Sequence, residues 1–189
     1  MANVDLKTKN SIKSVFYFKG IFSDYLDELQ QVTSVHPKLF DEIYKAYVFC
    51  VYYGLMKGKM HKYDPDKDVA SNPDRQLIGF RYEATNRAGG IYKYDTLRKI
   101  VILFDKSKKK SFSEKIDDAL RFDYSTNNVD DEDLIKKSLY GENTDLLEQY
   151  CLGGLELFYS KVSSISTPEA MMEFMDEVKE EFQELISSL

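Results

Sequence analysis

The sequence predicts a mostly α protein: a single-domain bundle of six to eight helices over residues 1–189, built around one central apolar helix at about 38–57. Three observations support this prediction. Apolar residues recur at three- and four-residue steps through most of the chain. The run AYVFCVYYGLM (46–56) is apolar nearly all round, so other helices must surround it. Strand-like composition is short, as in QLIGFRY (76–82).

The first helical pattern covers residues 12–31, as one helix or as two helices that Gly20 separates. A turn then leads to Pro37, which suits the first position of the next helix because its missing N–H costs nothing there. That helix, 38–57, is the central one. Gly58 suits its C-cap because glycine adopts a left-handed conformation without strain.

Residues 58–93 form an irregular, basic segment of the domain. A stretch of this length without regular structure is usually functional or mobile. The strand-like residues within it predict a small β-hairpin in 76–93.

Helices return after residue 93. Apolar spacing and capping residues predict helices at 94–106, 111–122, 132–140 (stopped by Gly141), 144–163 (capped by Asn143) and from Thr167-Pro168 to the end of the sequence.

Charge is distributed unevenly along the chain, whose net charge is −6. Residues 57–110 carry 14 Lys/Arg and 7 Asp/Glu, whereas residues 111–189 carry 6 Lys/Arg and 19 Asp/Glu. The basic middle and the acidic end either face each other within the protein or form two surfaces for other molecules. Both arrangements remain open from the sequence.

The start of the sequence, MANVDLKTKNSIKS, lacks the apolar centre of a secretory signal, and no apolar run approaches the roughly 20 residues of a membrane span. We therefore expect a cytoplasmic protein with no membrane contact. Cys50 and Cys151 are then expected to be reduced core thiols.

The loop HKYDPDKDVASNPDR (61–75) places aspartates at alternate positions, as at the start of a calcium-binding EF-hand loop. Counted from Asp64, however, the sixth position is Val69 where the loop needs glycine. The twelfth is Arg75, where it needs a bidentate glutamate. We therefore expect a polar loop and no metal.

Catalytic signals are missing as well. His36 and His61 are the only histidines, neither is near a cysteine at ligand spacing, and no nucleotide-binding, hydrolase or zinc motif occurs. We expect no catalytic residue, no metal ligand and no cofactor, and an enzyme with an unrecognised site is the least favoured class.

The basic residues of 57–110 alternate with tyrosine and phenylalanine, a composition that can neutralise phosphates and stack on bases. Nucleic-acid binding by this segment is therefore an alternative function, although the acidic net charge argues against it. Its candidate residues are Arg75, Arg81, Arg87, Lys93, Lys108, Lys109 and Lys110.

The last helix has a narrow apolar seam that includes methionines, which adapt to partner surfaces. The seam either packs in the core of its own domain or binds a partner. The candidate partner-binding residues are Met171, Met175, Val178, Phe182 and Leu185.

The stretches KAYVFCVYYGLMKGKM and YDTLRKIVILFDKS resemble segments of small helical accessory proteins encoded beside bacterial DNA-modification and anti-phage systems. The resemblance implies a complex-forming role and assigns no residues. Together, these observations predict a non-catalytic accessory or adaptor subunit that binds a larger protein partner, or a second copy of itself, in a bacterial defence or DNA-processing complex.

Overall fold

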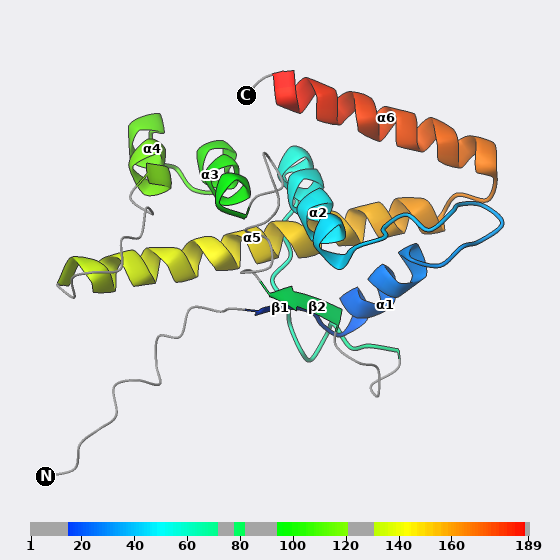
Figure 1. Ribbon diagram of the computed structural model, residues 1–189, viewed down its shortest axis with the longest axis horizontal. Helices are drawn as coiled ribbons and strands as arrows, with labels where there is room; N and C mark the ends of the chain where they lie inside the picture. The colour runs from blue at the N-terminus through cyan, green and yellow to red at the C-terminus, as the bar shows by residue number, and fades with distance from the viewer. Residues whose placement is uncertain (1–14, 72–77, 82–93, 121–130, 188–189) are drawn as a thin grey trace, which may run out of the picture. The chain divides into compact units, whose positions relative to one another are not determined.

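The computed structural model describes residues 15–71, 78–81, 94–120 and 131–187 (Figure 1). The protein is mostly α, as the sequence predicts, and the described ranges hold six helices and two short strands. In chain order these are β1 (Val15–Phe18), α1 (Ile21–Leu29), α2 (Ile43–Lys57), β2 (Ile78–Arg81), α3 (Tyr94–Phe104), α4 (Phe112–Leu120), α5 (Asp131–Ser163) and α6 (Pro168–Ser187).

The chain divides into two compact units. The first unit comprises residues 1–17 and 79–148, and the second comprises residues 18–78 and 149–189. Helix α5 belongs to both, because its first half lies in the first unit and its second half in the second.

The prediction of helix throughout 12–31 is wrong in its first half, where β1 forms instead. Its sequence VFYF alternates, with Phe16 and Phe18 buried and Tyr17 exposed between them. Bulky aromatic residues with this two-residue period suit a strand better than a helix. The break predicted at Gly20 is confirmed: Gly20 has φ 56°, and a Cβ there would overlap the Asp68 carbonyl. Helix α1 begins one residue later.

The hairpin predicted within 76–93 is described only at β2. β2 is a strand, as the composition predicts, but its partner in the two-stranded sheet is β1. Residues 82–93 lie outside the described residues.

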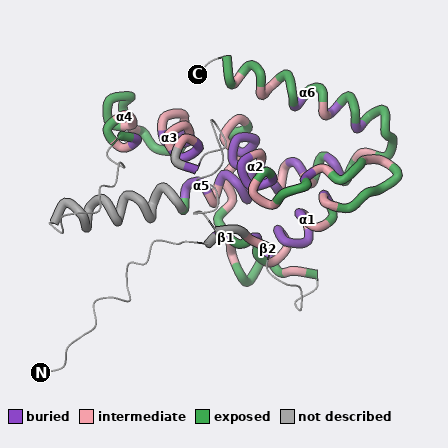
Figure 2. Tube along the Cα trace, viewed as in Figure 1, coloured by how far each residue is buried: buried purple, intermediate pink, exposed green. Residues whose placement is uncertain are grey.

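The central helix predicted at 38–57 exists but begins at Ile43. The residues before it continue as irregular chain, because Leu39 N–H donates to the Leu29 carbonyl (3.0 Å) and holds this segment against the end of α1. From Ala46 to Gly54 almost every residue of α2 is buried (Figure 2). The predicted C-cap is confirmed, since Gly58 is left-handed with φ 62°.

Two glycines allow α2 and the second half of α5 to approach closely. A Cβ on Gly54 would overlap the carbonyl of Tyr150, and a Cβ on Gly154 would overlap the carbonyl of Cys50. Helices reach such short separations only where side chains are absent at the crossing. Cys50 and Cys151 lie buried in this contact, and no disulfide joins them.

Aromatic side chains fill the rest of the second unit's core. The Phe158 ring of α5 lies 4.7 Å from that of Phe49 and 5.6 Å from that of Phe174 on α6, centroid to centroid. Phe40, from the segment before α2, contacts both Phe49 and Phe158. Aromatic pairs at these distances and tilts stabilise beyond the area they bury.

In the first unit, α3 and α4 form close to their predicted ranges. Ser111 and Glu114 make a reciprocal cap at the start of α4: Glu114 N–H donates to Ser111 Oγ, and Ser111 N–H donates to Glu114 Oε2 (2.7 Å). The predicted stop at Gly141 and cap at Asn143 are wrong, because α5 runs unbroken through both.

Candidate functional site

The acidic loop at 61–71 folds as a hydrogen-bonded turn of the second unit. The Asp68 side chain is buried, and its Oδ2 accepts the Asp64 N–H (2.7 Å). The Asp68 carbonyl accepts the Ile21 N–H (3.1 Å) at the start of α1. The aspartate that an EF-hand would direct toward a metal is therefore used to close the loop.

His61 joins this loop to α5. Its Nε2 lies 2.9 Å from Asp68 Oδ2, and its Nδ1 lies 3.4 Å from Glu156 Oε2. Lys59 Nζ also contacts Glu156 Oε2, at 3.3 Å. The edge of the His61 ring packs on Phe22 of α1, with centroids 4.9 Å apart. Both ring nitrogens thus face carboxylates, and His61 fastens the loop to α5.

The other two aspartates of the loop remain near its surface. The Lys67 ammonium (2.9 Å away) and the Asp66 N–H lower the pKa of the Asp64 carboxyl below its usual value. Among the described residues, no group of three His, Cys, Asp or Glu side chains is arranged to hold a metal ion.

A tyrosine pair lies near His61, Asp68 and Glu156. The rings of Tyr25 on α1 and Tyr159 on α5 stack with centroids 4.0 Å apart, and Tyr159 Oη donates to Glu28 Oε2 at 2.6 Å. Burial and the Glu28 carboxylate raise the pKa of Tyr159 to about 12. Burial, followed by the charges of Glu156 and Asp68, also raises the pKa of Tyr25. Both phenols are held in their neutral form.

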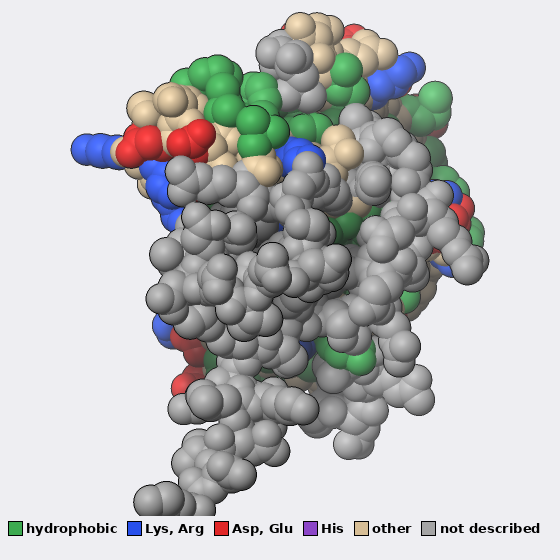
Figure 3. All heavy atoms as spheres, turned by 60° about the vertical axis from the view of Figure 1, so that its left-hand side comes forward, with side chains coloured by type: hydrophobic (Ala, Val, Ile, Leu, Met, Phe, Trp, Pro, Cys, Tyr) green, Lys and Arg blue, Asp and Glu red, His purple; other side chains and the backbone are tan. Residues whose placement is uncertain are grey.

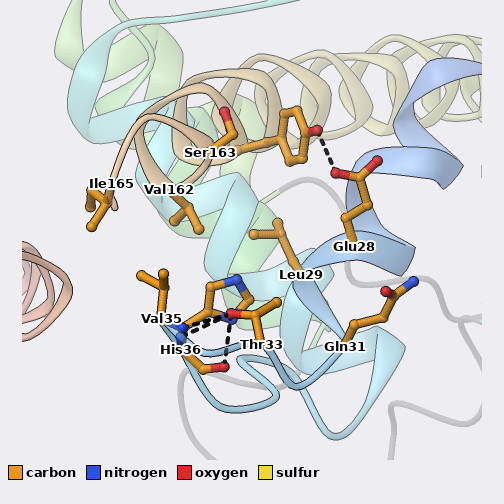
Figure 4. Close-up of a pocket in the computed structure, with 10 residues that line it drawn as sticks. Glu28, Leu29, Gln31, Thr33, Val35, His36, Val162, Ser163 and Ile165 are labelled. Atoms are coloured by element: carbon orange, nitrogen blue, oxygen red, sulfur yellow. Dashed lines mark hydrogen bonds between the residues drawn. The ribbon is translucent and has the colours of Figure 1, made fainter. Parts of the chain in front are cut away.

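A groove of about 560 Å³ opens next to this pair, between the end of α1, the turn that follows it and the end of α5 (Figure 4). Its lining combines apolar side chains with polar groups: Glu28, Leu29, Gln31, Thr33, Val35, His36, Tyr159, Val162, Ser163 and Ile165. No lysine or arginine is among them. Sequence reasoning missed this groove, because its walls come from segments more than 120 positions apart.

The turn that forms one wall is fixed by its own hydrogen bonds. Thr33 Oγ1 accepts the N–H groups of Val35 (3.1 Å) and His36 (3.0 Å), and the Thr33 N–H donates to the His36 carbonyl (2.9 Å). The His36 Nδ1 lies 2.8 Å from the Pro37 carbonyl. His36 therefore serves as a wall of the groove, and its ring is turned toward the backbone.

The seam predicted to bind a partner faces the second unit itself. Met171 and Val178 are buried, and the Phe182 ring stacks on Phe49 of α2 at 5.4 Å. Met175 and Leu185 are half-buried. The core alternative therefore accounts for most of this seam, and only its half-buried members retain partly open surface.

The opposite side of α6 is acidic. Glu169, Glu173, Asp176, Glu177, Glu180 and Glu184 are exposed, and Lys179 is the only basic residue of the helix. Among the described residues, the one α6 carboxylate in an ion pair is Glu181, which contacts Lys57 Nζ at 2.7 Å.

Three described lysines of residues 57–110 contact carboxylates from the acidic last third of the chain. Besides Lys57 and Lys59, Lys110 Nζ lies 2.6 Å from Asp118. Lys108 and Lys109 are exposed. The coloured part of the face in Figure 3 shows Lys and Arg side chains beside Asp and Glu side chains.

The remaining candidates for nucleic-acid contact cannot be placed in this way. Arg75, Arg87 and Lys93 lie outside the described residues, and Arg81 is described only as part of β2. Of the predicted phosphate-binding residues, the structure describes the side chains of Lys108, Lys109 and Lys110, which are consecutive, and the prediction for the set as a whole stays a prediction.

None of the described helices is long and apolar enough to cross a bilayer. Comparison with known proteins gives no relative: no family model, no curated protein and no solved structure matches the chain.

Proposed function

We propose that this protein is a non-catalytic accessory subunit that binds a larger protein partner, in a bacterial defence or DNA-processing complex. The observation that carries the proposal is the exposed outer face of α6, with six carboxylates and one lysine on a helix whose apolar seam is packed against its own unit. A helix anchored on one side and charged on the other presents a fixed surface to a second protein.

The chemistry of that face indicates the kind of partner. A row of carboxylates favours a basic protein surface, because complementary charge accelerates encounter and sets orientation. Proteins that process DNA carry such surfaces, since they neutralise phosphates with lysine and arginine. The resemblance of residues 45–60 and 94–107 to accessory proteins of DNA-modification systems supports the same class of partner.

Two further observations agree with a binding role rather than a catalytic one. Both ring nitrogens of His61 face carboxylates, and the Nδ1 of His36 faces a backbone carbonyl. The phenols of Tyr25 and Tyr159 have raised pKa values and so resist ionisation.

Co-purification tests the proposal. A tagged copy is expressed with its neighbouring genes, and the double variant E173Q/E180Q is compared with the control D41N/D66N, which removes two exposed carboxylates elsewhere in the second unit. We expect the wild type and the control to recover one defined partner, and the α6 variant to recover much less. Recovery of no partner, or equal recovery by both variants, would contradict the proposal.

The oligomeric state of the purified protein shows whether the acidic face of α6 binds a different protein or a second copy of the chain. We expect a monomer by light scattering in the absence of the partner. A stable homodimer that E173Q/E180Q dissociates would mean that the acidic face of α6 binds another copy instead.

A further inference from the structure

We propose that the groove between α1 and the end of α5 binds a segment of the partner polypeptide in which a large apolar side chain stands next to a lysine or arginine. This inference rests on the proposed function and adds a second contact, separate from the acidic face of α6. Three properties of the groove support it: its apolar floor, its negative potential and its fixed shape.

The floor and walls are apolar. Leu29 and Val162 are buried at the base of the groove, and Val35 and Ile165 stand half-buried at its side (Figure 4). Val32 lies in the same turn but outside the lining of the groove, and it is 78% exposed, the highest value among the large hydrophobic side chains described. A volume of about 560 Å³ lies in the range of binding pockets and is large enough for one or two bulky side chains.

The potential in the groove is negative for two independent reasons. The Glu28 carboxylate stands at its edge, exposed, with Oε2 accepting the Tyr159 hydroxyl. In addition, α1 ends at Leu29 and α5 ends at Ser163, so the carbonyl ends of two helix dipoles meet at this groove. Each helix end carries about half a negative charge.

No positive side chain offsets this potential within the lining. Lys161 is in the last turn of α5, but its Nζ lies over the Phe174 ring, 5.8 Å from the centroid, and lines a different hollow with α6. A peptide with a cation next to a large apolar side chain therefore complements both the negative potential and the apolar floor of the groove.

The groove also needs little rearrangement before binding. Its turn is held by the Thr33 hydrogen bonds, by the Leu39 N–H on the Leu29 carbonyl, and by the Gln30 side chain, which donates to the Phe40 carbonyl at 3.2 Å. A site fixed in this way avoids part of the ordering cost that binding otherwise requires.

Selection from a random dodecapeptide library tests the inference. The full-length protein is the target, and the variant I165S is used for counter-selection. We expect enriched peptides to share an apolar residue adjacent to Lys or Arg. A wild-type selection that enriches no common sequence, or one that enriches acidic sequences, would overturn the proposal.

An enriched peptide, labelled with fluorescein, is then titrated by anisotropy. I165S should weaken binding about tenfold, because roughly two methylene equivalents of buried contact are lost. E28Q should weaken it about two- to fivefold, the range expected for an exposed charge pair. The control V69S removes an exposed valine of the same unit that does not line the groove, and it should bind like the wild type. Urea unfolding of each variant verifies folding, and equal affinity for all four proteins would overturn the proposal.

The two proposals fail in different ways. If the library yields apolar–basic peptides but co-purification recovers no partner, the accessory function falls, and only the groove's preference for apolar–basic peptides stands. If I165S and E28Q recover the full partner as well as the wild type does, the groove proposal falls and the accessory function stands.

Discussion

At the scale of single residues, Asp68 shows how an acidic loop can be structural. Its buried carboxylate closes the loop on the Asp64 N–H and receives the His61 ring. We predict that D68A lowers the free energy of unfolding by about 1–3 kcal/mol, because the part-buried Asp64 N–H loses its acceptor and the His61 ring loses its partner. The exposed neighbour Asp66 provides the control, and D66A should change the free energy little. Urea unfolding measures both. If calcium stabilised the wild type and had no effect on D68A, the loop would be a metal site after all.

Tyr159 gives a prediction for the pH dependence. Its pKa is raised to about 12 from an ordinary value of 10.0, so folding favours the neutral phenol. The stability it contributes is complete below pH 10 and is lost as the pH rises from 10 toward 12. The difference in absorbance at 295 nm between wild type and Y159F should therefore titrate near pH 12. Circular dichroism, recorded in parallel, shows that the chain is still folded, and a difference that titrates near pH 10 in folded protein would contradict the prediction.

The sequence predicted the local part of this chemistry and missed the distant part. Val69 and Arg75 were sufficient to exclude an EF-hand, because the requirement for glycine and glutamate at fixed positions can be read locally. The use of Asp68 could not be read in the same way. Its loop is fastened by Glu156, 95 positions from His61, and no periodicity reports a contact between segments so far apart.

At the scale of elements, the crossing of α2 and α5 depends on Gly54 and Gly154. We predict that G154A lowers the free energy of unfolding by about 1–3 kcal/mol, because the new Cβ overlaps the Cys50 carbonyl. Alanine is the better helix former, so without this overlap the substitution would stabilise α5. The control S160A alters an exposed position of the same helix. An increase in stability for G154A, measured by urea unfolding, would contradict the close contact.

The helix ends that were predicted correctly are those where one or two residues in the local sequence fix the end. Thr167-Pro168 opens α6 and Gly58 closes α2, since each end is fixed by the conformational preference of one or two residues. The predictions that were wrong share one cause, which is that interactions with the rest of the structure outweigh a local preference. Gly141 was expected to stop a helix, but one glycine costs a helix only about 1 kcal/mol, which the rest of α5 can offset. The aromatic alternation of VFYF suits a strand, but it covers only four residues, and its pairing with β2, some 60 positions away, decides for the strand.

At the scale of the whole molecule, the uneven charge is partly compensated within the protein. Lys57, Lys59 and Lys110 contact carboxylates from the acidic last third, so part of the basic segment serves its own fold. This outcome was one of the two that the sequence left open. These ion pairs also lower the number of cations that the described residues can offer to phosphates. The six exposed carboxylates on the outer face of α6 are in no ion pair among the described residues.

These charges distinguish the accessory function from nucleic-acid binding by residues 57–110. We predict that duplex DNA and single-stranded RNA are not retained with the protein in filter binding at low ionic strength, because the net charge is −6 and three lysines of the segment are already paired. The variant K108Q/K109Q, which removes two exposed cations, should behave like the wild type. Retention that falls steeply with added salt and weakens in K108Q/K109Q would instead make the basic segment the functional surface. Its salt slope would then report how many phosphates the segment contacts, and the acidic face of α6 would no longer be needed to explain what the protein binds.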